Sequence, residues 1–112
     1  MAENPLADGL KSLDPSASQY ATAVVDALLA AAVTAGASDV HVHPVEGGLD
    51  LRWRVDGVLH RVAVLPKAGA PNVVARLKVL AELLTYKTDV PQEGRLRRVP
   101  GGVEMRLSTF PP

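Results

Sequence analysis

Two strands joined by the dipeptide Asp56-Gly57 constrain the fold of this chain more than any other feature. Residues 51–55 alternate between apolar and charged side chains, and Val58 to Leu65 reads as the returning strand before proline ends it. An Asp-Gly pair between two such runs is a strong signal for a two-residue hairpin turn. Strands joined this tightly must be antiparallel, so an antiparallel sheet is expected at the centre of the fold.

The segment before this hairpin predicts a helix followed by a third strand. Apolar residues recur at three- and four-residue steps over residues 20–32, which is typical of an amphipathic helix. We expect this helix to begin at Asp14-Pro15, with aspartate as the cap, and to end near Gly36. Residues 39–43 alternate strictly and predict a strand.

The rest of the chain predicts a second helix and a closing hairpin. Pro71 is placed to open the helix, and strands are expected at 96–99 and 103–107. The side chains expected on the buried face of this helix are Val73, Leu77, Leu80 and Leu84. The order α-β-β-β-α-β-β predicts an α+β fold, an antiparallel sheet with flanking helices. Residues 1–14 lack periodicity and are expected to be a linker or a disordered N-terminus.

Charge is distributed unevenly along the chain. The net charge is zero, but residues 1–50 carry seven acids and one base, a balance of −6, and residues 51–112 carry a balance of +6. This asymmetry predicts either a surface for an anionic partner or complementary charges within one fold, and both stay open. Aromatic residues make up only 4% of the chain, so base-stacking surfaces are lacking and no nucleic-acid partner is expected.

Neither a secretory signal nor a membrane-spanning segment is visible in the sequence. The N-terminus lacks a basic start followed by an apolar run, and the longest apolar run, residues 27–35, is too short to cross a bilayer. The chain contains no cysteine, which fits a reducing compartment. We therefore expect a soluble, cytoplasmic protein.

One strand face carries the only candidate metal ligands that the sequence pattern singles out. Period two places Asp39, His41 and His43 on one face, where two imidazoles and a carboxylate could bind a metal. No further ligand lies nearby, so an ordinary half-exposed strand face is favoured over a metal site. The phosphate-binding pattern G-x-x-x-x-G-K-[ST] is absent, and no catalytic residue or activity is expected from this chain alone.

The closing hairpin contains the candidate anion site. If Pro100-Gly101 forms its loop, Arg95 lies directly opposite Arg106. Like charges so opposed are unfavourable by about 0.2–1 kcal/mol. An anion between the two side chains would resolve this conflict, because guanidinium groups suit phosphate oxygens. Splaying of both side chains into water is the alternative, and the geometry of the hairpin leaves both open.

Three further charged residues could support this arginine pair. In the same register Arg97 faces Glu104, which is a favourable pair. A loop shifted by one residue would instead place Arg97 opposite Arg106. Arg54 shares a strand face with Arg52 and two aspartates, and a solvated, charge-balanced face is favoured there over ligand contact.

Five short motifs occur in the same order as in a known family of ATPases. They are ASDVHVHP (37–44), LRWRVDGVL (51–59), RLKVLAELL (76–84), PQEGR (91–95) and EMRLSTFP (104–111). They resemble the domain directly preceding the motor domain in type II secretion and type IV pilus assembly ATPases. That domain typically reads A-S-D-I-H-I-E-P, V-R-F-R-I-D-G, R-I-K-V-M-A, P-Q-D-G-R and D-x-R-V-S-T-x-P. Each motif alone is weak, but five in order over about residues 20–112 are specific.

The resemblance implies a PAS-like fold for residues 15–109, with residues 110–112 starting a linker to a motor domain absent from this chain. It implies a cytoplasmic, homo-hexameric ATPase that meets the secretion or pilus machinery at the inner membrane. ATP and Mg²⁺ would be bound in the complete enzyme, and no cofactor by this domain alone. Family arginines that approach the nucleotide phosphates correspond to Arg95 and Arg106. The implied role is to supply these arginines and to couple ATP hydrolysis to protein secretion or pilus assembly.

The chain departs from the family pattern at several charged positions. His43 stands where glutamate is usual, Glu93 and Glu104 replace aspartate, and Lys87 and Asp89 reverse the typical charges. These differences indicate a divergent branch, and they leave both arginines in place. A stand-alone PAS-like module that binds a protein or a small molecule is the alternative function.

Overall fold

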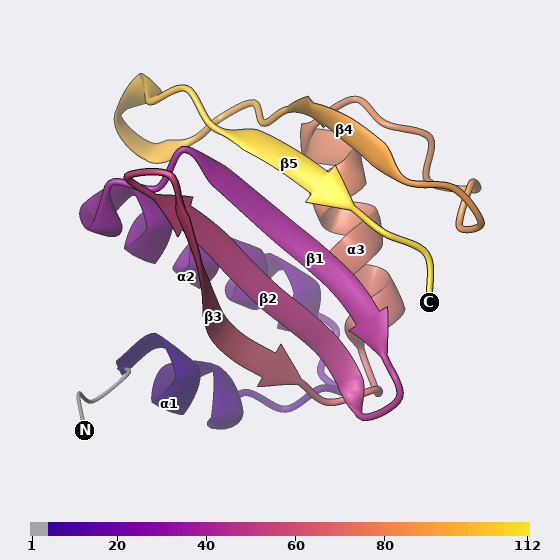
Figure 1. Cartoon of the computed structure of the whole chain (residues 1–112). Coiled ribbons are helices and arrows are strands. Elements are labelled where there is room, and N and C mark those ends of the chain that lie inside the picture. Colours follow the sequence, from indigo (N-terminus) through magenta and orange to yellow (C-terminus); the bar gives the residue numbers. More distant parts are fainter. Residues whose placement is uncertain (1–4) are drawn as a thin grey trace.

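A five-stranded sheet with helices packed on one face forms the fold (Figure 1). The computed structural model describes residues 5–112. The strands are β1 (Asp39–Val45), β2 (Gly48–Val55), β3 (Val58–Leu65), β4 (Gln92–Arg95) and β5 (Arg106–Thr109), in the sheet order β3-β2-β1-β5-β4. The helices are α1 (Pro5–Lys11), α2 (Tyr20–Ala35) and α3 (Ala70–Leu80), with a short 3₁₀ turn, η1 (Pro100–Gly102). The predicted α+β fold is confirmed.

Strand direction follows the prediction wherever a short connection joins two strands. β1 pairs antiparallel with β2, β2 with β3, and β4 with β5. β1 and β5, however, pair in parallel, so the sheet is mixed rather than antiparallel throughout. The chain reaches the second half of the sheet by way of α3, and such a crossover permits a parallel neighbour where a tight turn does not.

The predicted Asp56-Gly57 hairpin is confirmed in its position and its backbone geometry. Both residues have positive φ angles, 49° and 79°, as a type I′ turn requires. The returning strand β3 has the predicted bounds. A register shift between Leu51 and Arg52 puts a bulge in the pairing of β2 with β3. The hairpin therefore supplies β2 and β3, which lie on one side of β1 in the sheet.

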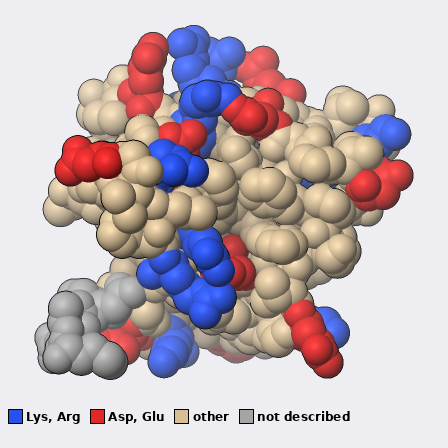
Figure 2. Space-filling view, viewed as in Figure 1, with Lys and Arg blue, Asp and Glu red and all other residues tan. Residues whose placement is uncertain are grey.

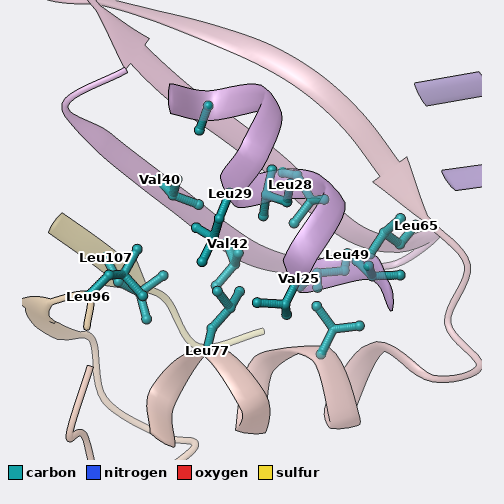
Figure 3. Packing of buried hydrophobic residues seen from close by; sticks show 14 of the residues in the cluster. Val25, Leu28, Leu29, Val40, Val42, Leu49, Leu65, Leu77, Leu96 and Leu107 are labelled. Carbon is teal, nitrogen blue, oxygen red and sulfur yellow. The ribbon is translucent and has the colours of Figure 1, made fainter. Parts of the chain in front are cut away.

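The hydrophobic core lies between the sheet and the helices α2 and α3 (Figure 3). Alternate residues of the strands point inward, and burying each Val or Leu side chain contributes about 1.5–3 kcal/mol. Trp53, one of the apolar residues in the alternating segment 51–55, is partly buried against this core. The fully buried side chains include Val40, Val42, Leu49, Leu51 and Leu107 from the strands and Val25, Leu28, Val73 and Leu77 from the helices.

The N-terminal part of the chain differs from the prediction. Helix α1 lies within the segment expected to be a linker, and its Leu10 is only 3% exposed in the core. Helix α2 begins at Tyr20 rather than at Pro15. Asp14 forms a local turn instead of a helix cap, because its Oδ1 accepts hydrogen bonds from the amide and the hydroxyl of Ser16. Residues 1–4 lie outside the described part of the chain.

Helix α3 is shorter than predicted, and the two strands of the closing hairpin lie further from its turn than predicted. The helix ends at Leu80 and Glu82 has a positive φ angle, so Leu84 leaves the helical period and is 49% exposed. The prediction places strands at 96–99 and 103–107, whereas β4 and β5 lie at 92–95 and 106–109 and residues 96–105 form the loop between them. The reason is that the amide of Arg97 donates to the carbonyl of Leu80, at 2.8 Å, instead of across the hairpin. Within residues 5–112 no helix is long and apolar enough to cross a membrane.

Candidate functional site

The arginine pair predicted in the closing hairpin is present. Arg95 of β4 and Arg106 of β5 are direct partners in the antiparallel register. Directly opposed residues project from the same face of a sheet, so both side chains lie on the face that the helices leave open. The predicted turn is also present, since the amide of Gly102 donates to the carbonyl of Val99 and Gly101 has a φ of 73°.

The two arginines line a shallow hollow at the edge of the open face. Its volume is about 480 Å³, and we call it the arginine hollow. Parts of β1, β4 and β5 meet here, because Arg106 is also the partner of Asp39 in the parallel pairing. The residues that line it are Ser38, Asp39, Glu93, Gly94, Arg95, Glu104, Met105 and Arg106.

Each arginine of the hollow has a carboxylate partner on the other side of the hairpin. Arg95 Nη1 donates to Glu104 Oε1 at 3.2 Å, and Arg106 Nη2 pairs with Glu93 Oε1. In both pairs the glutamate is diagonal to its arginine across the hairpin. The two arginines therefore lie next to each other, with Glu104 on one side of them and Glu93 on the other. The like-charge conflict that the sequence predicts is thus balanced by two carboxylates of the chain, a third arrangement beside the bound anion and the splayed side chains.

These ion pairs are weak because water reaches them. The side chains of Arg95 and Arg106 are 55% and 59% exposed, and their acidic partners are exposed to a similar degree or more. Exposed pairs of this kind contribute about 0.2–1 kcal/mol each and are screened by salt. Figure 2 shows acidic and basic side chains interleaved over the ends of β4 and β5, without a large patch of one sign.

The supporting residues expected from the sequence fall in different places. Glu104 lies in the hollow but pairs with Arg95, not with Arg97. Arg97 lies outside the hollow and pairs with Glu82, with its Nε 3.1 Å from Glu82 Oε1. The guanidinium of Arg54 donates to the carbonyl of Gly57 at 3.0 Å and stabilises the β2–β3 turn, so it does not line the hollow.

Sequence reasoning missed Glu93, although a signal for it was present. Glu93 precedes Arg95 by two residues in a strand and therefore shares its face. The register that opposes Arg95 and Arg106 places Glu93 opposite Ser108, diagonal to Arg106. The predicted register was thus sufficient to find this ion pair, because diagonal neighbours are within reach of long side chains.

The remaining residues of the PQEGR motif have structural roles around the hollow. The amide group of Gln92 donates to the carbonyls of Leu84 and Lys87 and accepts from the amide of Leu84. Lys78, which is buried, donates to the same carbonyl of Lys87 at 2.6 Å. Gly94 permits close packing, since a Cβ there would lie 2.9 Å from the carbonyl oxygen of Ala81. The motif therefore ties the loop after α3 to the strand that carries Arg95.

The candidate metal ligands do not form a metal site. Within residues 5–112, no group of three His, Cys, Asp or Glu side chains is placed to hold a metal ion. His41 and His43 instead pack against the ring of Phe110, with centroid distances of 5.6 Å and 5.7 Å. Burial and then the charge of Arg54 hold the pKa of His41 below its ordinary value, although Asp39 opposes this. The three side chains share one face of β1, on which the two histidines pack against Phe110.

A second charged group lies over β2 and β3 on the same open face (Figure 2). Asp50 is buried and pairs with Arg52 at 3.0 Å and with Arg61 at 3.2 Å. Burial raises the pKa of the Asp50 carboxyl, but hydrogen bonds from Arg61 and Arg52 lower it more, so it lies below its ordinary value. Because Asp50 belongs to the acidic half of the chain and both arginines to the basic half, this cluster shows internal charge complementarity.

Comparisons with known proteins place the chain among secretion proteins. Residues 15–112 match the family described as type II/IV secretion system protein. The type IV pilus assembly ATPase TfpB of Acinetobacter baylyi is 41% identical over 96 residues, which cover 83% of this chain and 16% of that protein. The type II secretion system ATPase E of Vibrio cholerae is 40% identical over 90 residues, 79% of this chain and 18% of that protein.

A third relative, the type II secretion system protein E of Pseudomonas aeruginosa, is 39% identical over 90 residues, which cover 79% of this chain and 18% of that protein. The matched residues thus make up less than a fifth of each of these relatives, and the comparisons concern one part of a larger protein. They confirm the resemblance carried by the five sequence motifs. The chain belongs to the type II/IV secretion system protein family.

Proposed function

We propose that this chain is an accessory domain of a secretion or pilus assembly ATPase, and that Arg95 and Arg106 contact the phosphates of a nucleotide held by a motor domain. The observation that carries the proposal is the register partnership of these two arginines on an open edge of the sheet. Two adjacent guanidinium groups are well suited to phosphate oxygens, which they can bind through parallel N–H donors.

The proposed function assigns nucleotide binding to the motor domain and the two phosphate-contacting arginines to this chain. The chain lacks a phosphate-binding loop, so ATP and Mg²⁺ belong to the motor domain. Arg95 and Arg106 would stabilise the charge that develops on the phosphate oxygens during hydrolysis. Homo-hexameric assembly would bring the motor domains together in the cytoplasm, next to secretion or pilus machinery at the inner membrane. Movement of a PAS-like domain relative to the motor would couple hydrolysis to transport.

A domain replacement in a complete relative tests the arginine assignment. Residues 15–112 would replace the matching segment of the V. cholerae secretion ATPase, and ATP turnover of this chimera would be measured with and without Arg106→Ala. Arginines that contact a transferring phosphoryl group contribute about 10³–10⁵ in rate in other systems. We expect Arg106→Ala to lower turnover by about three orders of magnitude.

Arg98→Ala is the matched control for this experiment. Arg98 is exposed in the loop between β4 and β5 and does not line the hollow, and its replacement changes the net charge by the same amount. The control should leave turnover nearly unchanged. Equal turnover in the Arg106→Ala chimera and the parent chimera would refute the assignment of Arg106 to the nucleotide.

The alternative function, a PAS-like ligand-binding module, is supported by a second cavity. This cavity of about 410 Å³ lies between α3, the turn before β2 and residues 85–90, and most of its surface is apolar. Its volume falls within the range of small-molecule sites. A thermal-shift screen of apolar acids against the 112-residue chain separates the two functions, since only the module hypothesis expects an apolar ligand that binds in this cavity without a motor domain.

A further inference from the structure

We propose that Glu93 and Glu104 are exchangeable counter-ions that shield Arg95 and Arg106 until phosphate oxygens displace them. This inference rests on the proposed function for the identity of the physiological anion. It adds that the chain itself regulates access to the arginines. The two glutamates are positioning residues, because they act on the arginines and not on the nucleotide.

The first argument is the charge of the arginine hollow. Its charged lining consists of two guanidinium groups and three carboxylates, those of Asp39, Glu93 and Glu104. A site with this balance does not attract a polyanion, since each carboxylate beside a bound phosphate repels it. The carboxylates of the hollow therefore disfavour the binding of a phosphate, although the hollow has room for one.

The second argument is the order of the charges. The two diagonal pairs place one glutamate at the outer side of each arginine, and the arginines are adjacent to each other. A phosphate that entered between the arginines would compete with both glutamates for the same N–H donors. Carboxylate and phosphate oxygens both suit the guanidinium fork, so displacement exchanges one set of charge-assisted hydrogen bonds for another.

The third argument is that these pairs open easily. All four side chains are more than half exposed, so water can solvate each group as the pairs separate. A buried pair would resist such exchange, because separating it leaves a desolvated charge. Asp50 is the buried counterpart within this chain, because separating it from Arg52 and Arg61 would leave a desolvated carboxylate.

Binding of inorganic tripolyphosphate to the 112-residue chain tests the proposal directly. We would compare the wild type with Glu93→Gln/Glu104→Gln by titration calorimetry at low ionic strength. Removing one charge about 4 Å from a bound charge changes affinity about fivefold in water, so the double variant should bind about 10- to 30-fold more tightly. Because salt screens exposed charges, the gain should shrink toward unity near 1 M salt.

Glu46→Gln/Glu82→Gln is the matched control. It removes two exposed carboxylates that lie outside the hollow, Glu46 in the β1–β2 turn and Glu82, which pairs with Arg97. Its net charge equals that of the Glu93/Glu104 variant. Adding Arg106→Ala to the Glu93/Glu104 variant should abolish the gain. Glu104→Gln alone, at the more exposed of the two glutamates, gives the same test with a smaller gain if the double variant folds poorly.

The outcomes separate this inference from the proposed function. Tripolyphosphate binding no tighter than that of the Glu46/Glu82 control would overturn the counter-ion role, even if Arg106→Ala lowers ATP turnover in the chimera. A specific gain together with unchanged turnover in that chimera would support the counter-ions and reject the nucleotide as their physiological anion. A loss of stability without a change in affinity would show that the glutamates serve only the fold.

Discussion

Replacing Asp50 by asparagine should destabilise the domain at neutral pH and much less in acid. Asp50 is 3% exposed and accepts hydrogen bonds from Arg61 through both oxygens, at 3.2 Å, and from Arg52 at 3.1 Å. Asparagine keeps the size of the side chain but removes the charge, and its amide N–H₂ group would face the guanidinium groups.

The expected magnitude depends on the exposure of the partners. Breaking a buried ion pair costs about 3–5 kcal/mol. The side chains of Arg52 and Arg61 are 40% and 59% exposed, so water recovers part of that loss. We expect the free energy of unfolding to fall by about 1–3 kcal/mol at pH 7, which for a domain of this size lowers Tm by about 5–12 °C.

The pH dependence supplies the sharper test. The pKa of Asp50 is lower in the folded state than its ordinary value, so its contribution is fully present above about pH 4 and is lost as pH falls through the folded-state pKa. The difference in unfolding free energy between wild type and Asp50→Asn, measured by urea denaturation, should therefore shrink between pH 4 and pH 2. Asp56→Asn, at an exposed turn position that tolerates asparagine, should have little effect at either pH. A difference that stayed constant down to pH 2 would show that packing, and not ionisation, explains the cost.

Two further substitutions test the packing around the hollow and the N-terminal helix. Gly94→Ala places a Cβ against the carbonyl of Ala81 and the side chain of Leu83, and we expect it to lower the free energy of unfolding by about 1–3 kcal/mol in urea titrations; no change would show that the loop after α3 adjusts freely. Leu10→Ala should cost about 2 kcal/mol by the same measurement, because Leu10 is buried in the core; a linker, as the sequence suggested, would give no change.

The sequence predicted best those features that depend on neighbouring residues. The Asp56-Gly57 turn specifies its own backbone geometry, and the pairing of Arg95 with Arg106 is obtained by counting outward from the Pro100-Gly101 turn. The alternation of apolar and charged side chains over residues 51–55 likewise predicted an apolar strand face, on which Trp53 packs against the core. In each case the information lies within a few residues of the feature.

The misses came from contacts between segments that are distant in the sequence. Helix α1 is only seven residues long and has little helical signal of its own, since short helices depend on tertiary packing, here of Leu10. The parallel pairing of β1 with β5 arises after the crossover through α3. The pairing of Arg95 with Glu104 depends on the conformation of the loop before β5, whereas the pairing of Arg106 with Glu93 follows from the register alone.

The interior position of β5 has a mechanical consequence. The strand lies between β1 and β4, and beyond its end the amide of Phe110 still donates to the carbonyl of Val42, at 3.2 Å. The hydrogen bonds of β5 cross the strand direction on both sides, so a force applied at residues 110–112 along the strand loads them in shear. The hydrogen bonds of β5 must then break together, and not one after another as when a strand is pulled away sideways. The sheet would thus resist such a pull as one unit, and the ring of Phe110, packed against the imidazole rings of His41 and His43, adds side-chain contacts at this end of the strand.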